Sequence, residues 1–339
     1  VKIELKDFRN DYYFRYAPET QTDRELAFES WETGSKLVPA ECATQNPAEF
    51  TVSGNLTVTP NINVKGYCWE YQEVDGVKQV VNHIHRWKWA SCADADRTVK
   101  LDACIEPVVA TTENNLVFDT VERVRYNGKN YAITSLSAGW SITALQNSRV
   151  GTWAVSPRFS SFGTKTCAGS NFSLTNMVGL SDIKSCTVGS SAFIDAGANF
   201  SGPVTNFVPR NVTTIGDYSY QAKRFTGELL LEKVTSIASG AFNNSSLASL
   251  RITSSGLQSI GGWALSSSAL KEVTFAGSLA KLTSVAVNSF AANAVTNFNF
   301  KVAPPTIAML DTILTQTAAG DGAHACRLTV DSSIAAWWA

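Results

Sequence analysis

The chain has 339 residues, of which 44% are hydrophobic and 17% are charged, and its formal net charge is −1. The charged fraction is below the quarter that is usual in globular proteins. The near-neutral balance gives no overall field that would attract nucleic acid or an anionic membrane. No segment reaches the roughly 18 consecutive apolar residues of a membrane-spanning helix. The sequence therefore predicts no nucleic-acid partner and no membrane span in this chain.

Cysteine usage bears on the compartment. There are seven cysteines and no Cys-x-x-Cys pair, so zinc-ribbon and thioredoxin-like folds lose their main support. Four cysteines lie between positions 42 and 104, which would allow two disulfides in an N-terminal domain. The alternative is that the cysteines are buried thiols acting as small hydrophobic residues. We expect an extracellular or cell-surface protein whose leader is absent because the chain starts at Val1.

Residues 1–115 do not repeat, and they are predicted to form a small antiparallel β-domain, sandwich-like from about residue 40. Apolar and polar residues alternate there, as in strands with one buried face, over 50–60, 67–76, 77–89 and 98–105. Asp75-Gly76 predicts a two-residue hairpin turn. In the leading segment 1–39 we expect a strand at 12–17 and a short helix around Arg24–Trp31. The polar stretch 111–115 is the predicted linker.

Aromatic residues are concentrated in this N-terminal domain. Trp69, Trp87 and Trp89 are candidates for an exposed platform that stacks on sugar rings; the alternative is that they fill the core of a small domain. His83 and His85 fall on one face of a strand, but no spacing supplies a third or fourth ligand, so we predict no metal site.

The second domain, residues 116–339, contains an internal repeat. VTTIGDYSY (212–220), VTSIASGAF (234–242), LQSIGGWAL (257–265) and LTSVAVNSF (282–290) share one frame. Their Ile or Val positions are 215, 237, 260 and 285, spaced by 22, 23 and 25 residues. Such a period is the signature of a stacked solenoid.

The second half of each unit repeats as well. LASLRI (247–252), LKEVTF (270–275) and VTNFNF (295–300) end in a period-2 alternation that predicts one short strand per unit. Leu250, Val273 and Phe298 would stack in one inward column, and Ile252, Phe275 and Phe300 in the next. Upstream, Phe207 and the pair Leu229/Leu231 can take the same places. One such strand cannot bury its apolar face alone, but stacked units form a continuous core.

These repeats resemble the BspA-like leucine-rich repeat family, which is found on bacterial and protozoan cell surfaces. The resemblance covers about residues 121–339. NGKNYAITSL (127–136) is similar to the start of many such arrays, and APPTI (303–307) with CRLTVDSSIAAWWA (326–339) is similar to their end. It implies a cap at about 303–339, with Asp331 where a proline is usual and Trp337 and Trp338 closing the core. In this repeat frame Cys167 and Cys186 would lie at nearly equivalent places on neighbouring coils. They would then face each other either as a disulfide or as a pair of buried thiols.

The outward strand positions form the candidate protein-binding face. We expect Asn206, Val208, Leu230, Ser249, Thr253 and Ala276 on it, and its candidate binding residues are Arg210, Glu228, Glu232, Arg251, Glu272, Thr274, Asn297, Asn299 and Lys301. The resemblance implies a surface-exposed protein that acts in adhesion by binding a protein on a host or neighbouring cell.

Two other functions stay open. One is a glycan-binding accessory protein that uses the N-terminal tryptophans. The other is an enzyme with a cryptic site. The chain has only three histidines and no Gly-x-Ser-x-Gly elbow, so we predict no catalytic residues, no cofactor and no enzyme.

Overall fold

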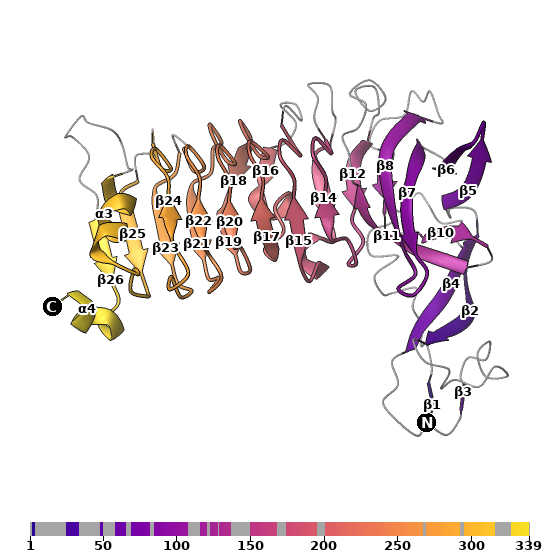
Figure 1. Ribbon diagram of the computed structural model, residues 1–339, viewed down its shortest axis with the longest axis horizontal. Coiled ribbons are helices and arrows are strands. Elements are labelled where there is room, and N and C mark those ends of the chain that lie inside the picture. The colour runs from indigo at the N-terminus through magenta and orange to yellow at the C-terminus, as the bar shows by residue number, and fades with distance from the viewer. Residues whose placement is uncertain are drawn as a thin grey trace.

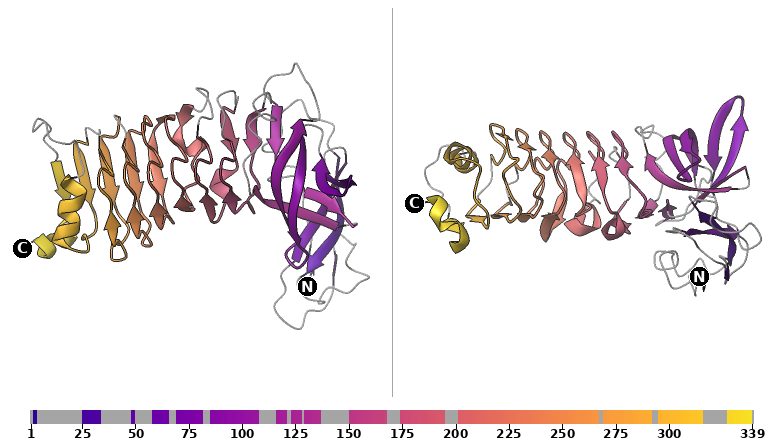
Figure 2. Two further views of the ribbon diagram at one scale, coloured as in Figure 1. Left: turned by 45° about the horizontal axis from the view of Figure 1, so that its top comes forward. Right: turned by 60° about the horizontal axis from the view of Figure 1, so that its bottom comes forward.

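A computed structural model shows an elongated, mostly β protein (Figure 1). The structure describes residues 2–3, 25–33, 48–49, 58–65, 69–81, 85–107, 116–120, 123–127, 129–136, 150–167, 174–194, 201–266, 269–291, 295–315 and 327–338. Figure 2 shows the coils of a solenoid stacked between N-terminal sheets and two C-terminal helices. The predicted class, an antiparallel β region followed by a leucine-rich repeat solenoid, is confirmed.

The N-terminal region is antiparallel, as alternation predicts. Two small two-stranded sheets pair β1 (Lys2–Ile3) with β3 (Ala48–Glu49) and β2 (Glu25–Thr33) with β4 (Val58–Lys65). A meander follows through β5 (Trp69–Val74), β6 (Val77–Val81), β7 (His85–Ala93) and β8 (Thr98–Pro107).

Two local predictions in this region have opposite outcomes. The hairpin is confirmed, because Asp75 and Gly76 connect β5 and β6 with φ of 51° and 74°, the positive values that a type I′ turn needs. The short helix around Arg24–Trp31 is wrong. Residues Glu25–Thr33 form β2, because pairing with β4 overrides the local pattern. The strand predicted at 12–17 and the linker at 111–115 lie outside the described residues.

Hydrogen bonds join the N-terminal meander to the solenoid. β10 (Arg123–Tyr126) and β11 (Lys129–Leu136) form a hairpin, in which β10 pairs in parallel with β5 and β11 with β8. A sheet of 12 strands therefore runs from the meander into the coils, so the main-chain pairing is continuous across the predicted boundary. The boundary near residue 115 stays a prediction.

One sheet of the solenoid is made of short parallel strands. These are β13 (Ser161–Phe162), β15 (Cys186–Val188), β17 (Val212–Ile215), β20 (Ser236–Ile237), β22 (Ser259–Ile260) and β24 (Ser284–Val285). Ile215, Ile237, Ile260 and Val285 pair in register, so the repeat frame is confirmed. All four side chains are buried, which explains why an Ile or Val recurs there.

A second sheet, which we call the strand face, has five parallel strands. They are β19 (Glu228–Leu231), β21 (Ser249–Ile252), β23 (Glu272–Phe275), β25 (Asn297–Phe300) and β26 (Arg327–Val330). Leu250, Val273 and Phe298 pair in register and are at most 1% exposed. The inward columns are therefore confirmed.

The remaining strands of the solenoid pair outside these two sheets. Parallel pairs link β9 (Leu116–Asp119), β12 (Val150–Ala154) and β14 (Asn176–Val178), and β16 (Ser201–Pro203) with β18 (Arg224–Thr226). The 3-10 helices are η2 (Leu180–Asp182), η3 (Val204–Asn206) and η4 (Ser332–Ile334). The expectation of an outward strand from Asn206 to Arg210 is wrong, because η3 turns the chain and Val208 is buried.

Two helices lie at the C-terminal end of the stack. Helix α3 (Ile307–Thr315) packs against β24 and buries Leu310 and Ile313, and α4 (Ala335–Trp338) follows η4 (Figure 1). Trp337 is partly buried against the core, in agreement with a capping role. The side chain of Trp338 lies outside the described part.

Candidate binding surface

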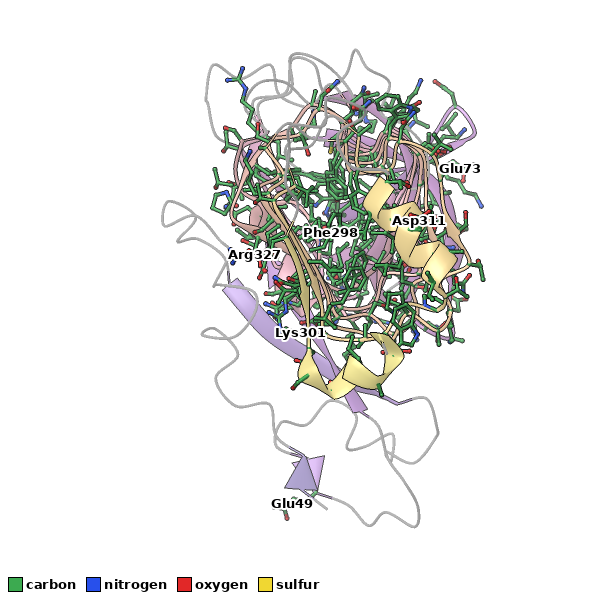
Figure 3. All side chains as sticks on the ribbon, turned by 90° about the vertical axis from the view of Figure 1, so that its left-hand side faces the viewer. Glu49, Glu73, Phe298, Lys301, Asp311 and Arg327 are labelled. Atoms are coloured by element: carbon green, nitrogen blue, oxygen red, sulfur yellow. The ribbon has the colours of Figure 1, made fainter. Side chains whose placement is uncertain are left out.

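The outer side of the strand face carries residues in straight rows across the strands. Parallel pairing in register aligns Glu228 with Ser249, Glu272, Asn297 and Arg327, and Leu230 with Arg251, Thr274, Asn299 and Thr329. Figure 3 looks along the stack and shows Phe298 in the interior, whereas Lys301 and Arg327 lie on the outer side of the sheet. The strand register thus brings together the predicted residues from β19 to β25.

The face also includes strand β26, which the candidate residues omitted. Arg327 and Thr329 continue the two rows, and Asp331 follows them. The alternation in CRLTVDSS predicted a last strand. Its outward residues could therefore have been added to the face from the sequence alone.

Hydrogen bonds between side chains hold part of this surface in place. Asn299 donates from Nδ2 to Oε1 of Glu272 at 2.6 Å and lies 3.4 Å from Oγ1 of Thr274. Thr329 donates from Oγ1 to Oδ1 of Asn297 at 3.2 Å. Thr274 is only 6% exposed, so it supports its neighbours and offers a partner little surface.

Ion pairs occupy the margin of the face. Arg210 lies 3.6 Å from Glu232, and Lys301 lies 3.7 Å from Asp331. Two hydrogen bonds from Ser333, one from its main-chain N–H and one from Oγ, lower the pKa of Asp331, and Lys301 adds to this. Exposed pairs of this kind contribute little to stability, but they fix the charges in place and neutralise them locally.

A small patch near the β19 end of the face stays accessible. Glu228 and Arg251 are exposed, and Leu230, the direct neighbour of Arg251 in the row, is half-buried. Within the ranges that the structure describes, Glu228 and Arg251 take part in no ion pair. We call Glu228, Leu230 and Arg251 the Arg251 patch.

The predicted tryptophan platform is largely wrong. Trp69 and Trp87 are completely buried and pack on Phe118, with ring centroids 5.9 and 5.5 Å away. They belong to the core because β5 and β7 turn this side toward the solenoid interior. Trp89 is half-buried at the rim, where its ring lies 5.2 Å from Tyr71 in an edge-to-face arrangement and 5.1 Å from Tyr126 in a tilted one. Such a cluster presents ring edges and no common flat surface.

Three cysteines can be described, and all are thiols. Cys92 is exposed, whereas Cys167 and Cys186 are buried. Of the two alternatives for Cys167 and Cys186, the buried free thiols are therefore found. Because Cys92 is free, the four N-terminal cysteines do not form two disulfides. Burial raises the pKa of Cys186 to about 12 and raises that of Cys167 as well, against the influence of Lys223.

Metal binding and membrane spanning can be judged for the ranges that the structure describes. There, no group of three His, Cys, Asp or Glu side chains is arranged to hold a metal ion. In the same part of the chain, none of the helices has the length and apolar character required to cross a membrane. His83 and His324 lie outside the described residues.

Comparison with known proteins agrees with the repeat geometry. A family model for the BspA type leucine rich repeat region matches residues 187–308 in six copies. These residues, about a third of the chain, are therefore similar to BspA-type leucine-rich repeats. The match runs from within β15 to the start of α3, and so includes four of the five strands of the strand face. No curated protein matches the chain.

Two solved structures are similar at low identity. A leucine-rich repeat protein from Bacteroides ovatus has 13% sequence identity, covers 75% of this chain and 99% of its own, and gives a TM-score of 0.27. The pneumococcal vaccine antigen PcpA has 9% identity, covers 78% of this chain and 100% of its own, and gives a TM-score of 0.22. With TM-scores this low, neither likeness defines the fold or function of this chain.

Proposed function

We propose that the chain is a protein-binding part of a secreted or cell-surface protein, and that its strand face receives a protein on a host or neighbouring cell. The observation that supports this role is the register of the five strands, which aligns their outward residues in straight rows. A solenoid sheet of this kind offers a long rigid surface to a partner.

Within this face the Arg251 patch is the proposed centre of binding. Glu232, Glu272 and Lys301 each have a partner on the face already, so binding another protein would require those contacts to be rearranged. Arg251 and Glu228 are exposed and Leu230 supplies apolar contact area beside them. Arginine is enriched at the energetic centres of interfaces, where it combines a long apolar stem with a charged fork.

The proposal is tested by measuring binding of the whole chain to a panel of purified extracellular-matrix proteins in a surface-based assay. For a partner that binds, Arg251→Ala should lower the affinity about tenfold or more, as expected for a central residue. Lys281→Ala is the matched control, because it removes one exposed positive charge away from the strand face. Equal affinity of Arg251→Ala, Glu228→Ala and the unmodified chain would refute the proposed site.

A further inference from the structure

One corner of each coil has left-handed backbone. The residue concerned lies three positions after the last residue of β13, β15, β17, β20, β22 or β24. Its φ is 56° at Lys165, 55° at Ser191, 53° at Tyr218, 63° at Gly240, 57° at Trp263 and 63° at Asn288. We call this column of residues the corner column. In each coil the corner column comes just after the strand of the β13–β24 sheet in the sequence, and it contains no residue of the strand face.

The two aromatic residues of the corner column are unexpected. Positive φ favours glycine and is tolerated by asparagine, whereas it is unusual for bulky side chains. Tyr218 is nevertheless 43% exposed and Trp263 is 47% exposed. Packing in the core therefore does not explain why aromatic residues occupy these two positions. Strained backbone that carries an exposed functional group is a frequent feature of ligand sites.

The intervening coil makes room for one of these rings. Gly240 occupies the corner between Tyr218 and Trp263, and a Cβ atom at Gly240 would overlap the ring of Tyr218. The ring therefore packs across the glycine and is still partly exposed. A ring positioned in advance loses little freedom when a ligand stacks on it.

The coil spacing sets the distance between the two corners. In the buried ladder of Phe193, Tyr220 and Phe242, rings of successive coils lie 5.1 and 5.3 Å apart. Tyr218 and Trp263 are two coils apart, which places their corners about 10 Å apart at the usual strand spacing. In an extended β-1,4-linked glycan, every second sugar presents the same face, and the two-sugar repeat has about this length.

Hydrogen bonding and charge at the corner argue against other ligands. The main-chain N–H groups of Tyr218, Gly240 and Trp263 donate to carbonyls of the next coil at 3.0, 2.9 and 3.2 Å, so no free strand edge is available to a peptide. Asp217 is the charged residue of these three corners, and its Oδ1 accepts from the N–H of Ser239 at 3.0 Å. Nucleic acid would require a positive surface.

We propose that Tyr218 and Trp263 form a stacking site for a neutral oligosaccharide with an extended, β-1,4-linked backbone. The rings contact the C–H faces of alternate sugars, and Ser239, an exposed residue of the intervening coil, offers a hydroxyl group to the sugar chain. This site is independent of the protein-binding role proposed for the strand face.

The test is affinity gel electrophoresis of the full chain in gels that contain hydroxyethylcellulose, glucomannan or, as a different linkage, dextran. We expect at least one β-1,4-linked polymer to retard the chain and dextran not to. Tyr218→Gly and Trp263→Gly should each weaken the association about tenfold, as loss of a stacked ring does. Trp263→Phe should retain most of the binding.

The glycine variants keep the test informative. Because φ is positive at both positions, glycine relieves the backbone, so these variants should unfold at the same or a higher temperature. Ile307→Ala is the control, since Ile307 is 74% exposed but lies on α3. The proposal fails if no β-1,4-linked polymer retards the chain, or if a folded double glycine variant is retarded as before. It also fails if no polysaccharide binds the chain and the double glycine variant no longer binds matrix proteins, because the two rings would then contact a protein.

Discussion

The ring of Tyr220 stacks on that of Phe242 in the next coil, with centroids 5.3 Å apart and an interplanar angle of 8°. Phe193 stacks on the other side of Tyr220 at 5.1 Å and 14°, and all three side chains are fully buried. The hydroxyl of Tyr220 donates to the carbonyl of Phe207 at 3.1 Å. This ladder couples three coils through side chains in addition to the main-chain hydrogen bonds.

The ladder predicts a graded loss of stability at position 242. Phe242→Ala should lower the free energy of unfolding by about 3–5 kcal/mol, because it leaves a cavity between two coils. Phe242→Leu should cost less, since Leu265 occupies the equivalent place in the following coil and is also fully buried. Urea unfolding followed by circular dichroism measures both. Equal losses for the two variants would show that the stacked ring itself, and not the filled volume, provides the stability.

The sequence predicted the coils well because their signals are local and repeated. Ile215, Ile237 and Ile260 recur at a nearly constant period, and the period-2 alternation next to them fixes which side chains point inward. The strand face followed from the same alternation. An error of one residue would have turned every side chain of a strand to the other side.

The failures have physical causes that a local pattern does not contain. Trp69 and Trp87 alternate as an exposed aromatic row would, and only their packing on Phe118, which comes from β9 and is distant in the sequence, shows that this side is covered. Residues 206–210 have the apolar spacing of a strand. Pro203 and Pro209 remove main-chain donors on both sides, and the chain forms η3 there.

The described cysteines should differ in reactivity. In the native chain at pH 8, Cys92 should be alkylated by iodoacetamide, while Cys167 and Cys186 should not react, because burial both shields them and raises their pKa. In urea all three should react. Peptide mass spectrometry of the alkylated sites measures this. Rapid labelling of Cys186 under native conditions would mean that the coil around β15 opens locally.

The lowered pKa of Asp331 predicts how stability depends on pH. A carboxyl group whose folded pKa is below the ordinary value of about 3.9 stabilises the fold above that pH and loses this contribution as pH falls through the folded pKa. The difference in melting temperature between the unmodified chain and Asp331→Asn should thus be constant from pH 8 to 5 and shrink below about pH 4. Ser333→Ala removes the hydrogen bond from Oγ but keeps the one from the main-chain N–H, which is the largest cause, so this pH dependence should become weaker but persist. Its complete loss in Ser333→Ala would show that the side-chain hydrogen bond alone lowers the pKa of Asp331.

The contact of Tyr218 with Gly240 predicts a coupling between the two positions. Gly240→Ala should lower the free energy of unfolding for two reasons: its φ of 63° costs about 1–2 kcal/mol for a residue with Cβ, and the added carbon overlaps the Tyr218 ring. In a Tyr218→Gly background only the backbone cost remains, so the same substitution should be less harmful. A double-mutant cycle by urea unfolding measures the difference, which we expect to be about 0.5–1.5 kcal/mol for residues in contact. Strict additivity would show that the ring swings away from Gly240 freely, and would remove the fixed ring on which the stacking site depends.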